Sequence, residues 1–410
     1  MNAENFDLRS PALRLLAAAP HRLLFCIGAT NILLAMGWWT SWLVGARWGL
    51  IDTAQMQLPA GWMHAMTMQY QVLPSFMFGF LLTVFPRWMN QPALSRWHYL
   101  PVGLGLFGGQ ALTLAAVLGA LPLLKAGAVV TLLGWSIGTV ILAGLVRRDA
   151  MRTWHAISCT AALVFGLFGL ALYTLCLYRL DGLLMVASVK IGSILMLLPI
   201  FFTVCHRMIP FFASGVIKGY RPLRPMWALA MFWVGVFAHA GLELYQGYAW
   251  LWLADLPLTV LTATLLWMWW PRGESMPPLL RVLFAGFAWL PIAFSLYAAQ
   301  SVEYALTGQF HLGRAPAHAL FIGFFGSLLV AMVTRVTQGH SGRPLVLGKV
   351  AAFAFITLQV VAVIRVLAEV LPDALAWQAL AAAGWMLAFV PWVARSVWIY
   401  ITPRIDGQPG

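Results

Sequence analysis

The sequence predicts an all-α integral membrane protein, a polytopic bundle of about twelve transmembrane helices with both termini in the cytoplasm. Composition is the first observation behind this class: of 410 residues, 62% are hydrophobic and only 9% are charged, whereas soluble domains carry roughly 25% charged residues. The second is that long apolar segments recur from Leu23 to Ile401. A helix needs roughly 20 such residues to cross a bilayer, so the chain is long enough for about a dozen crossings.

The expected helices follow one another with short connections. They cover residues 22–45, 62–86, 98–120, 122–146, 154–178, 184–212, 226–247, 249–270, 280–304, 315–337, 346–370 and 374–400. This division leaves a cytoplasmic N-terminal segment over residues 1–21, a single transmembrane domain over 22–401 and a cytoplasmic tail over 402–410. Pro74, Pro199 and Pro291 fall inside expected helices, where they predict kinks.

The basic residues indicate the orientation of the bundle. The net charge is +13, and Lys and Arg gather in every second connection, for example at Arg147 and Arg148 after the fourth span and at Lys218 and Arg221 after the sixth. By the positive-inside rule these connections lie in the cytoplasm. Because the charges are scattered between apolar segments and form no dense patch, they do not indicate a nucleic-acid partner.

Glycines and cysteines suggest packing more than chemistry. The segment from Gly103 to Gly108 matches a dinucleotide-binding pattern, but it lies inside an apolar helix and lacks the preceding strand that such a site requires. Gly105 and Gly109 are better explained by close approach of two membrane helices. The cysteines stand singly, without the spacing of a disulfide framework or a thiolate metal site.

Histidines are the strongest candidates for a functional site, because polar groups in a bilayer are costly and usually functional. His64 and His318 stand near the outer starts of the second and tenth spans, at similar depth, with Met68 one turn beyond His64. Imidazole coordinates heme iron and copper, so the pair fits two axial heme ligands. The alternative is a pair of interfacial histidines bonded to backbone carbonyls. His239, late in span seven, and His311, in the outer loop before span ten, are expected near a second metal.

A second group of polar residues lies toward the cytoplasmic face. Arg335, His340 and Arg343 follow span ten. Arginine suits the carboxylates of a bound cofactor or a passing anion, although in this position it equally serves as a positive-inside anchor. Lys190 and Glu243, in or near spans six and seven, could belong to a proton or ion route.

Three segments resemble the NnrS family of bacterial membrane proteins. The most specific begins at His318-Ala-Leu-Phe-Ile-Gly-Phe-Phe-Gly326 and continues through Arg335 to Gly339-His-Ser-Gly-Arg-Pro-Leu345. Another joins Trp62-Met-His-Ala65 and Met68 to Gly79-Phe-Leu-Leu-Thr83, and the third is Arg207-Met-Ile-Pro-Phe-Phe212. In the second segment Met66 and Thr67 stand where the family pattern has His and Glu, which puts in doubt any cofactor that uses those two groups.

The resemblance implies heme b and copper, and a role in nitric oxide or nitrogen-oxide metabolism or in protection from nitrosative stress, in the bacterial inner membrane. The residues expected to bind the cofactor are His64, His318, Met68, Arg335, His340 and Arg343. The implied partners are membrane lipid, nitric oxide or a related small molecule, and a quinol or other redox partner. Whether the protein is an enzyme stays open. The competing class is a transporter of an anionic or cofactor-like substrate without bound metal, and the third is a structural or assembly subunit of a respiratory complex.

Overall fold

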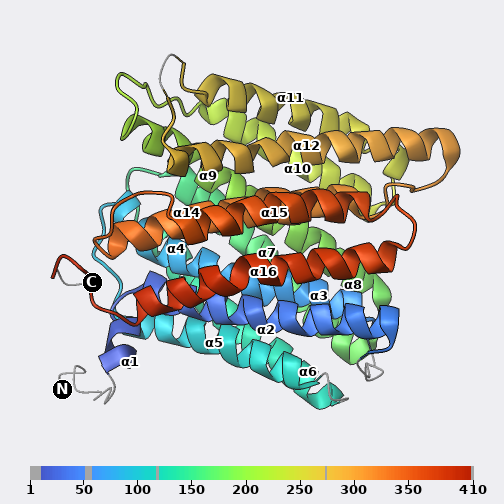
Figure 1. Cartoon of the computed structure of the whole chain (residues 1–410), viewed down its shortest axis with the longest axis horizontal. Coiled ribbons are helices and arrows are strands. Elements are labelled where there is room, and N and C mark those ends of the chain that lie inside the picture. The colour runs from blue at the N-terminus through green and yellow to red at the C-terminus, as the bar shows by residue number, and fades with distance from the viewer. Residues whose placement is uncertain (1–10, 51–57, 117–119, 273–274, 408–410) are drawn as a thin grey trace.

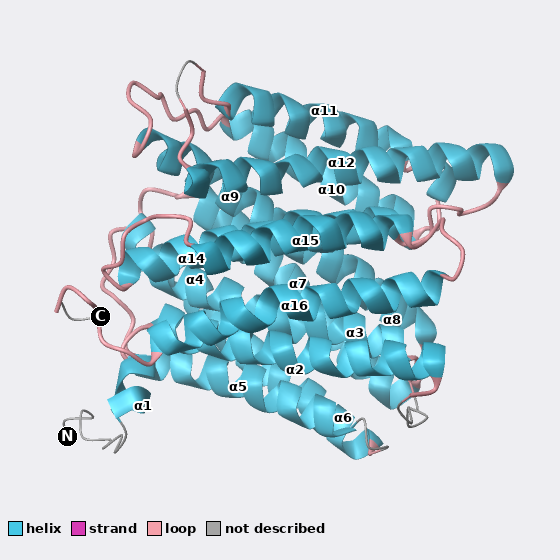
Figure 2. Ribbon diagram, viewed as in Figure 1, coloured by secondary structure: helices cyan, strands magenta, loops and turns pink. Residues whose placement is uncertain are grey.

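The apolar segments form helices because a bilayer offers no water to the backbone, so each N–H and C=O must be bonded within its own helix. The computed structural model describes residues 11–50, 58–116, 120–272 and 275–407, and these contain helices and no strand. Helices account for most of the described chain, and loops join them at the two ends of the bundle (Figure 2). The predicted N-terminal segment and tail extend beyond this, since residues 1–10 and 408–410 lie outside the described residues.

Eleven helices in the described part of the chain are long and apolar enough to cross a membrane. A twelfth, α5, has 20 residues and begins with Arg-Trp-His-Tyr, which lowers its hydropathy. After the short α1 (Pro11–Leu16), the order is α2 (Pro20–Trp48), α3 (Ala60–Thr67), η1 (Met68–Val72), α4 (Leu73–Trp88), α5 (Arg96–Ala115), α6 (Leu121–Arg147), α7 (Trp154–Arg179), α8 (Gly182–Lys190), η3 (Ile191–Leu197), α9 (Leu198–Ser214), α10 (Met226–Leu244), η4 (Tyr248–Trp250), α11 (Trp252–Trp269), α12 (Pro278–Thr307), α13 (Ala315–His318), η5 (Ala319–Gly326), α14 (Ser327–His340), α15 (Lys349–Leu367) and α16 (Ala374–Tyr400). The predicted class, an all-α membrane bundle of about twelve helices, is confirmed.

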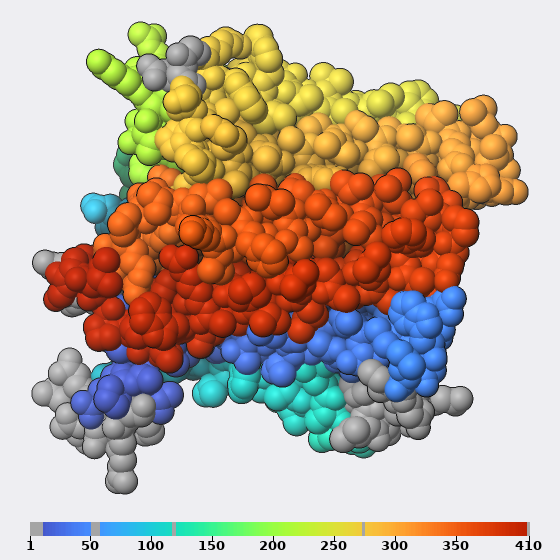
Figure 3. All heavy atoms as spheres, viewed as in Figure 1, coloured from blue at the N-terminus to red at the C-terminus, as the bar shows by residue number. Residues whose placement is uncertain are grey.

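The helices lie side by side, nearly parallel to one long direction (Figure 1). Helix α1 and the C-terminal end of α16 lie at the same end of the bundle, at the left of Figure 1. This agrees with an even number of crossings, and the positive-inside rule makes this end the cytoplasmic one. Seen from the side of α15 and α16, the surface closes over the central helices (Figure 3). Exposed apolar side chains of α15, among them Phe353, Ile356 and Val360, suit contact with lipid.

Three spans contain a π-helical segment near their middle: η1 between α3 and α4, η3 between α8 and α9, and η5 between α13 and α14. Pro74 and Pro199 are the second residues of α4 and α9, directly after two of these segments. Proline has no N–H, and its ring crowds the carbonyl four residues earlier. The carbonyl released in this way before Pro74 belongs to Tyr70, and it accepts a hydrogen bond of 2.8 Å from Trp135 Nε1. The kinks predicted at Pro74 and Pro199 therefore coincide with widened turns, whereas Pro291 lies within the uninterrupted α12.

Helices α5 and α6 touch through their backbones. A Cβ added at Gly105 would lie 2.5 Å from Gly134 Cα, and one added at Gly109 would lie 2.1 Å from Thr131 Oγ1. Only glycine fits such an approach. The glycines of α5 therefore serve helix packing, as the sequence predicted.

Candidate functional site

A polar cavity of about 350 Å³ lies in the half of the bundle away from the termini, between the first halves of the three spans that carry π-helical segments. His64 from α3 and His318 from α13 line it, together with Trp39, Lys190 and Arg365. Its volume falls in the range of cofactor and small-molecule sites, roughly 300–1,000 Å³. Because π-helical segments often accompany functional sites, the cavity is the first candidate for function.

The local structure around His318 prepares its ring for coordination. His318 Nδ1 lies 2.9 Å from the backbone carbonyl oxygen of Arg314, one turn earlier. A carbonyl can only accept a hydrogen bond, so Nδ1 is the nitrogen that carries the hydrogen. In the neutral ring this leaves Nε2 with its lone pair. Metal-binding histidines are commonly oriented in this way, by donation from the other nitrogen to a carbonyl.

His64 is held by aromatic stacking. Its ring lies on that of Trp39, with centroids 4.4 Å apart and planes at 12°, and Trp39 stacks in turn on Trp42. His64 Nδ1 is buried and has no hydrogen-bond partner among the described residues. Buried polar atoms are nearly always paired, so this nitrogen is one that a bound group would complete.

Positive charge predominates in the cavity wall. Lys190, Arg314 and Arg365 line it, whereas Glu243 is the one acidic residue in the described lining. Arg314 and Arg365 act electrostatically on both His64 and His318. A ligand that carries carboxylates or another anionic group would therefore be favoured here.

A buried network of ionisable residues extends from the cavity to α11. Lys190, from α8, donates to Glu243 Oε1. His239 Nε2 lies 3.5 Å from Glu243 Oε2, and His239 Nδ1 lies 2.7 Å from Asp255 Oδ1, where both side chains are fully buried. The ring of Tyr297, which also lines the cavity, meets His239 edge to face at 5.0 Å. Both nitrogens of His239 thus face carboxylates.

His311, the other residue expected near a second metal, has an exposed side chain and pairs with Glu303 at the outer end of α12. It does not line the cavity. Within the described ranges, no group of three or more His, Cys, Asp or Glu residues is arranged to hold a metal ion. A second metal at His239 or His311 stays a prediction.

The remaining predicted site residues divide between the two ends of the bundle. Met68 lines the cavity with the two histidines. Arg335, His340 and Arg343 belong to the far end of α14 and the turn after it, and none of them lines the cavity. Their rings and guanidinium groups instead contact aromatic partners: Arg335 lies 4.0 Å from the Phe212 ring, His340 packs at 4.2 Å on His21, and Arg343 lies 5.3 Å from Trp398. The structure does not bring these three residues to the histidines, so their cofactor role stays a prediction.

Sequence reasoning passed over several residues of the site. Arg365 could have been recognised as an arginine inside an apolar span, with Glu369 one turn later as its partner. Asp255 carried the same signal, as an acidic residue in an apolar helix. Trp39 gave no comparable signal, because tryptophan is abundant near the ends of many spans and only the fold shows which one meets a histidine.

The fold and the site together define a class: polytopic α-helical membrane proteins with a polar, histidine-lined cavity in the outer half of the bundle. Within this class the chain belongs to the NnrS family, because the family model described as "NnrS protein" matches residues 15–404. The predicted resemblance is confirmed. The family is related to nitric oxide and is associated with heme and copper. No curated protein gives a significant match to the chain.

The family positions replaced in this chain lie beside the cavity wall. Met66 and Thr67 are buried and do not line the cavity, whereas His64, Ala65 and Met68 do. The replacement of the family's His and Glu therefore leaves the described lining of this cavity intact.

Proposed function

We propose that the outer cavity would hold heme b through His64 and His318, and that the protein acts in nitric oxide metabolism or nitrosative-stress protection in the bacterial inner membrane. The observation that carries the proposal is the hydrogen bond from His318 Nδ1 to the Arg314 carbonyl. It leaves Nε2 of His318 as the coordinating nitrogen, in a cavity that His64 also lines.

The cavity wall suits a flat, amphipathic group. Trp39, Phe321 and Trp385 offer apolar surface, while Arg314 and Arg365 offer planar guanidinium groups that match carboxylates such as heme propionates. When bound, heme supplies an iron centre that takes up nitric oxide and changes redox state. The residues of this chain hold and orient the group, and the surrounding apolar side chains limit the access of water.

If the protein turns over its ligand, it also needs electrons from a quinol or another redox partner, and protons. The Lys190 and Glu243 pair places exchangeable hydrogens at the cavity wall, with His239 and Asp255 behind it. If the protein only binds nitric oxide, the same polar groups balance charge around the bound cofactor. Copper binding stays a prediction. The described residues contain no group of three or more His, Cys, Asp or Glu side chains that could hold a metal ion.

A reduced-minus-oxidised visible spectrum of the purified protein tests the heme site. We expect a b-type spectrum in the wild type that is lost in His64→Ala and in His318→Ala. His311→Ala is the matched control, because His311 is an outer histidine that does not line the cavity, and it should keep the spectrum. Absence of a heme band from wild-type protein expressed with added heme would refute the assignment; if the band is present, nitric oxide titration follows.

The transporter alternative gains support from one observation, the excess of positive charge in the cavity wall. A transporter of an anionic substrate would use Lys190, Arg314 and Arg365 to bind its cargo without metal. In that case, heme-free protein in proteoliposomes should take up an organic anion, and Arg365→Gln should lower the uptake. Heme bound stoichiometrically, with no anion uptake, would exclude this alternative.

A further inference from the structure

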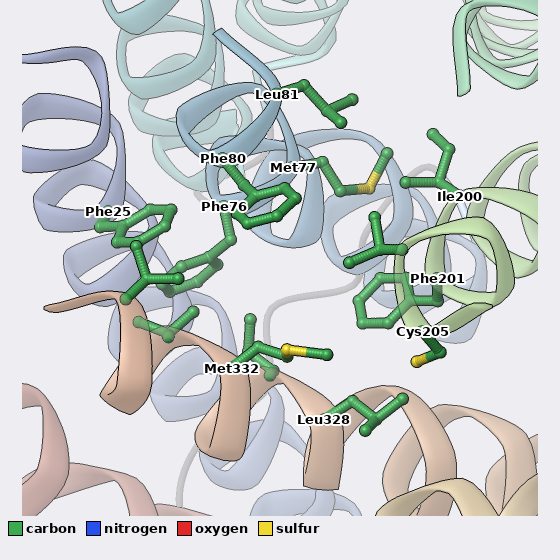
Figure 4. A pocket seen from close by; sticks show the side chains of 14 residues that line it. Phe25, Phe76, Met77, Phe80, Leu81, Ile200, Phe201, Cys205, Leu328 and Met332 are labelled. Carbon is green, nitrogen blue, oxygen red and sulfur yellow. The ribbon is translucent and has the colours of Figure 1, made fainter. Parts of the chain in front are cut away.

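A second, smaller cavity lies further along the same spans and differs from the first in its chemistry. It measures about 60 Å³ and is lined by side chains of α2, α4, α9 and α14. Figure 4 shows the empty space between Phe76, Met77 and Phe80 on one side, Phe201 and Cys205 on another, and Met332 on a third. The Cys205 thiol is the one hydrogen-bond donor, and a weak one, among the described lining side chains, and the thioethers of Met77 and Met332 are weak acceptors.

This apolar cavity and the polar cavity are lined by successive turns of the same spans. Leu73 and Ile194 line the polar cavity, whereas Phe76 and Ile200, further along the same two spans, line the apolar one. A row of aromatic rings joins them. Phe321, in the polar cavity wall, packs at 5.4 Å on Phe325.

Phe325 in turn packs at 4.6 Å on Phe201, which lines the apolar cavity. Three rings in contact, those of Phe321, Phe325 and Phe201, therefore connect the walls of the two cavities.

The walls determine which molecules can occupy the apolar cavity. Water needs about two to four polar partners in a buried site, and apolar cavities stay dry and accept apolar guests such as xenon. A quinol head group would need partners for its hydroxyl groups, which these walls do not offer. The volume is several times the roughly 10–15 Å³ that a water-sized probe requires, but it is far below the size of a cofactor site. A small apolar molecule meets all of these limits.

The geometry points to a holding site for a small apolar gas of the nitric oxide class, connected to the polar cavity by the row of rings of Phe201, Phe325 and Phe321. The identity of the gas rests on the proposed function, whereas the site itself does not. The gas would pass from the bilayer, in which apolar molecules dissolve readily, into the apolar cavity and would bind there beside Phe201. Rotation of Phe325 or Phe201 would then open the way to the polar cavity.

Xenon is a probe for the site that requires neither heme nor activity. Crystals of the full chain under xenon pressure should show an anomalous peak among Phe80, Phe201 and Met332. Cys205→Leu adds volume inside the cavity and should abolish the peak. Cys26→Leu makes the same chemical change on α2, at a half-buried residue outside the cavity lining, and should keep it.

An enlarging variant covers the case in which Cys205→Leu does not fold. Leu328→Ala removes side-chain volume from the wall and should increase xenon occupancy. Xenon bound in lipid-facing grooves but absent from this cavity in the wild type would overturn the holding site. A xenon peak in protein that never binds heme would support the cavity and overturn the proposed heme function, so the two failures are distinguishable.

Discussion

Asp255→Ala tests whether the buried network holds the outer half of the bundle together. Asp255 Oδ1 lies 2.7 Å from His239 Nδ1, and neither side chain is exposed. At an effective dielectric constant of about 20, two unit charges at this distance attract by about 6 kcal/mol, most of which the loss of hydration offsets. Removing one partner of a buried charged pair costs about 3–5 kcal/mol, and leaving a neutral buried group unpaired costs about 1–3 kcal/mol. We therefore expect Asp255→Ala to lower the free energy of unfolding by about 3 kcal/mol, a value that lies in both ranges.

The assay is equilibrium unfolding of the full chain in mixed detergent micelles, in which the fraction of denaturing detergent is increased. Asp373→Asn is the control: the Asp373 carboxylate pairs with Arg47 at the exposed surface, and asparagine keeps an oxygen for the N-cap of α16 and suits the left-handed backbone of this residue. Loss of this charge alone should shift the transition much less. The double variant His239→Leu with Asp255→Ala should recover part of the loss, because no unpaired imidazole remains. Equal shifts for Asp255→Ala and Asp373→Asn, with no recovery in the double variant, would refute a stabilising role for the pair of Asp255 and His239.

Two further predictions concern packing and pH. Gly105→Val should separate α5 from α6, because its Cβ would lie 2.5 Å from Gly134 Cα. We expect the free energy of unfolding to fall by about 1–3 kcal/mol, which thermal unfolding measures. An unchanged melting temperature would contradict contact between the two backbones. The hydrogen bonds from Arg47 hold the pKa of the Asp373 carboxyl below its usual range, so this pair stabilises the fold above the unfolded value of about 3.9. That stabilisation is lost as pH falls through the lower folded pKa. The melting temperatures of wild type and Asp373→Asn should therefore become equal on acidification. If the wild type still melts at a higher temperature in strong acid, the ion pair is not the cause of the difference.

Much of the fold was predictable because the bilayer imposes a simple rule. Each apolar segment of sufficient length must form a helix, and the expected segments from 22–45 to 374–400 correspond to observed helices from α2 to α16. Packing of α5 on α6 through Gly105 and Gly109 was also predictable, since small residues allow close approach. The π-helical turns were only partly visible in the sequence: Pro74 and Pro199 mark two of them, but η5 contains no proline.

The candidate site was predictable only as a pair of residue types at similar depth. His64 and His318 stood out because ionisable groups are rare in membrane spans, and the structure places both on one cavity. Arg335, His340 and Arg343 belong to the same sequence segment as His318, yet they lie toward the opposite end of the span that runs from Ala315 to His340. A helix rises 1.5 Å per residue, so neighbours in a signature can be separated by most of a bilayer.

The sequence by itself determined the class of protein, the order of the helices and the family, because these depend on segment length, apolar content and motifs along the chain. The orientation of the helices, which the distribution of Lys and Arg indicates, stays a prediction. The tertiary structure alone decided which polar residues meet. The pairing of His239 with Asp255, the stacking of Trp39 on His64 and the closure of the apolar cavity by α4, α9 and α14 all join segments far apart in the chain. Such contacts depend on the rotation and neighbours of each helix, which are set by side-chain packing between helices and leave no signal within any one of them.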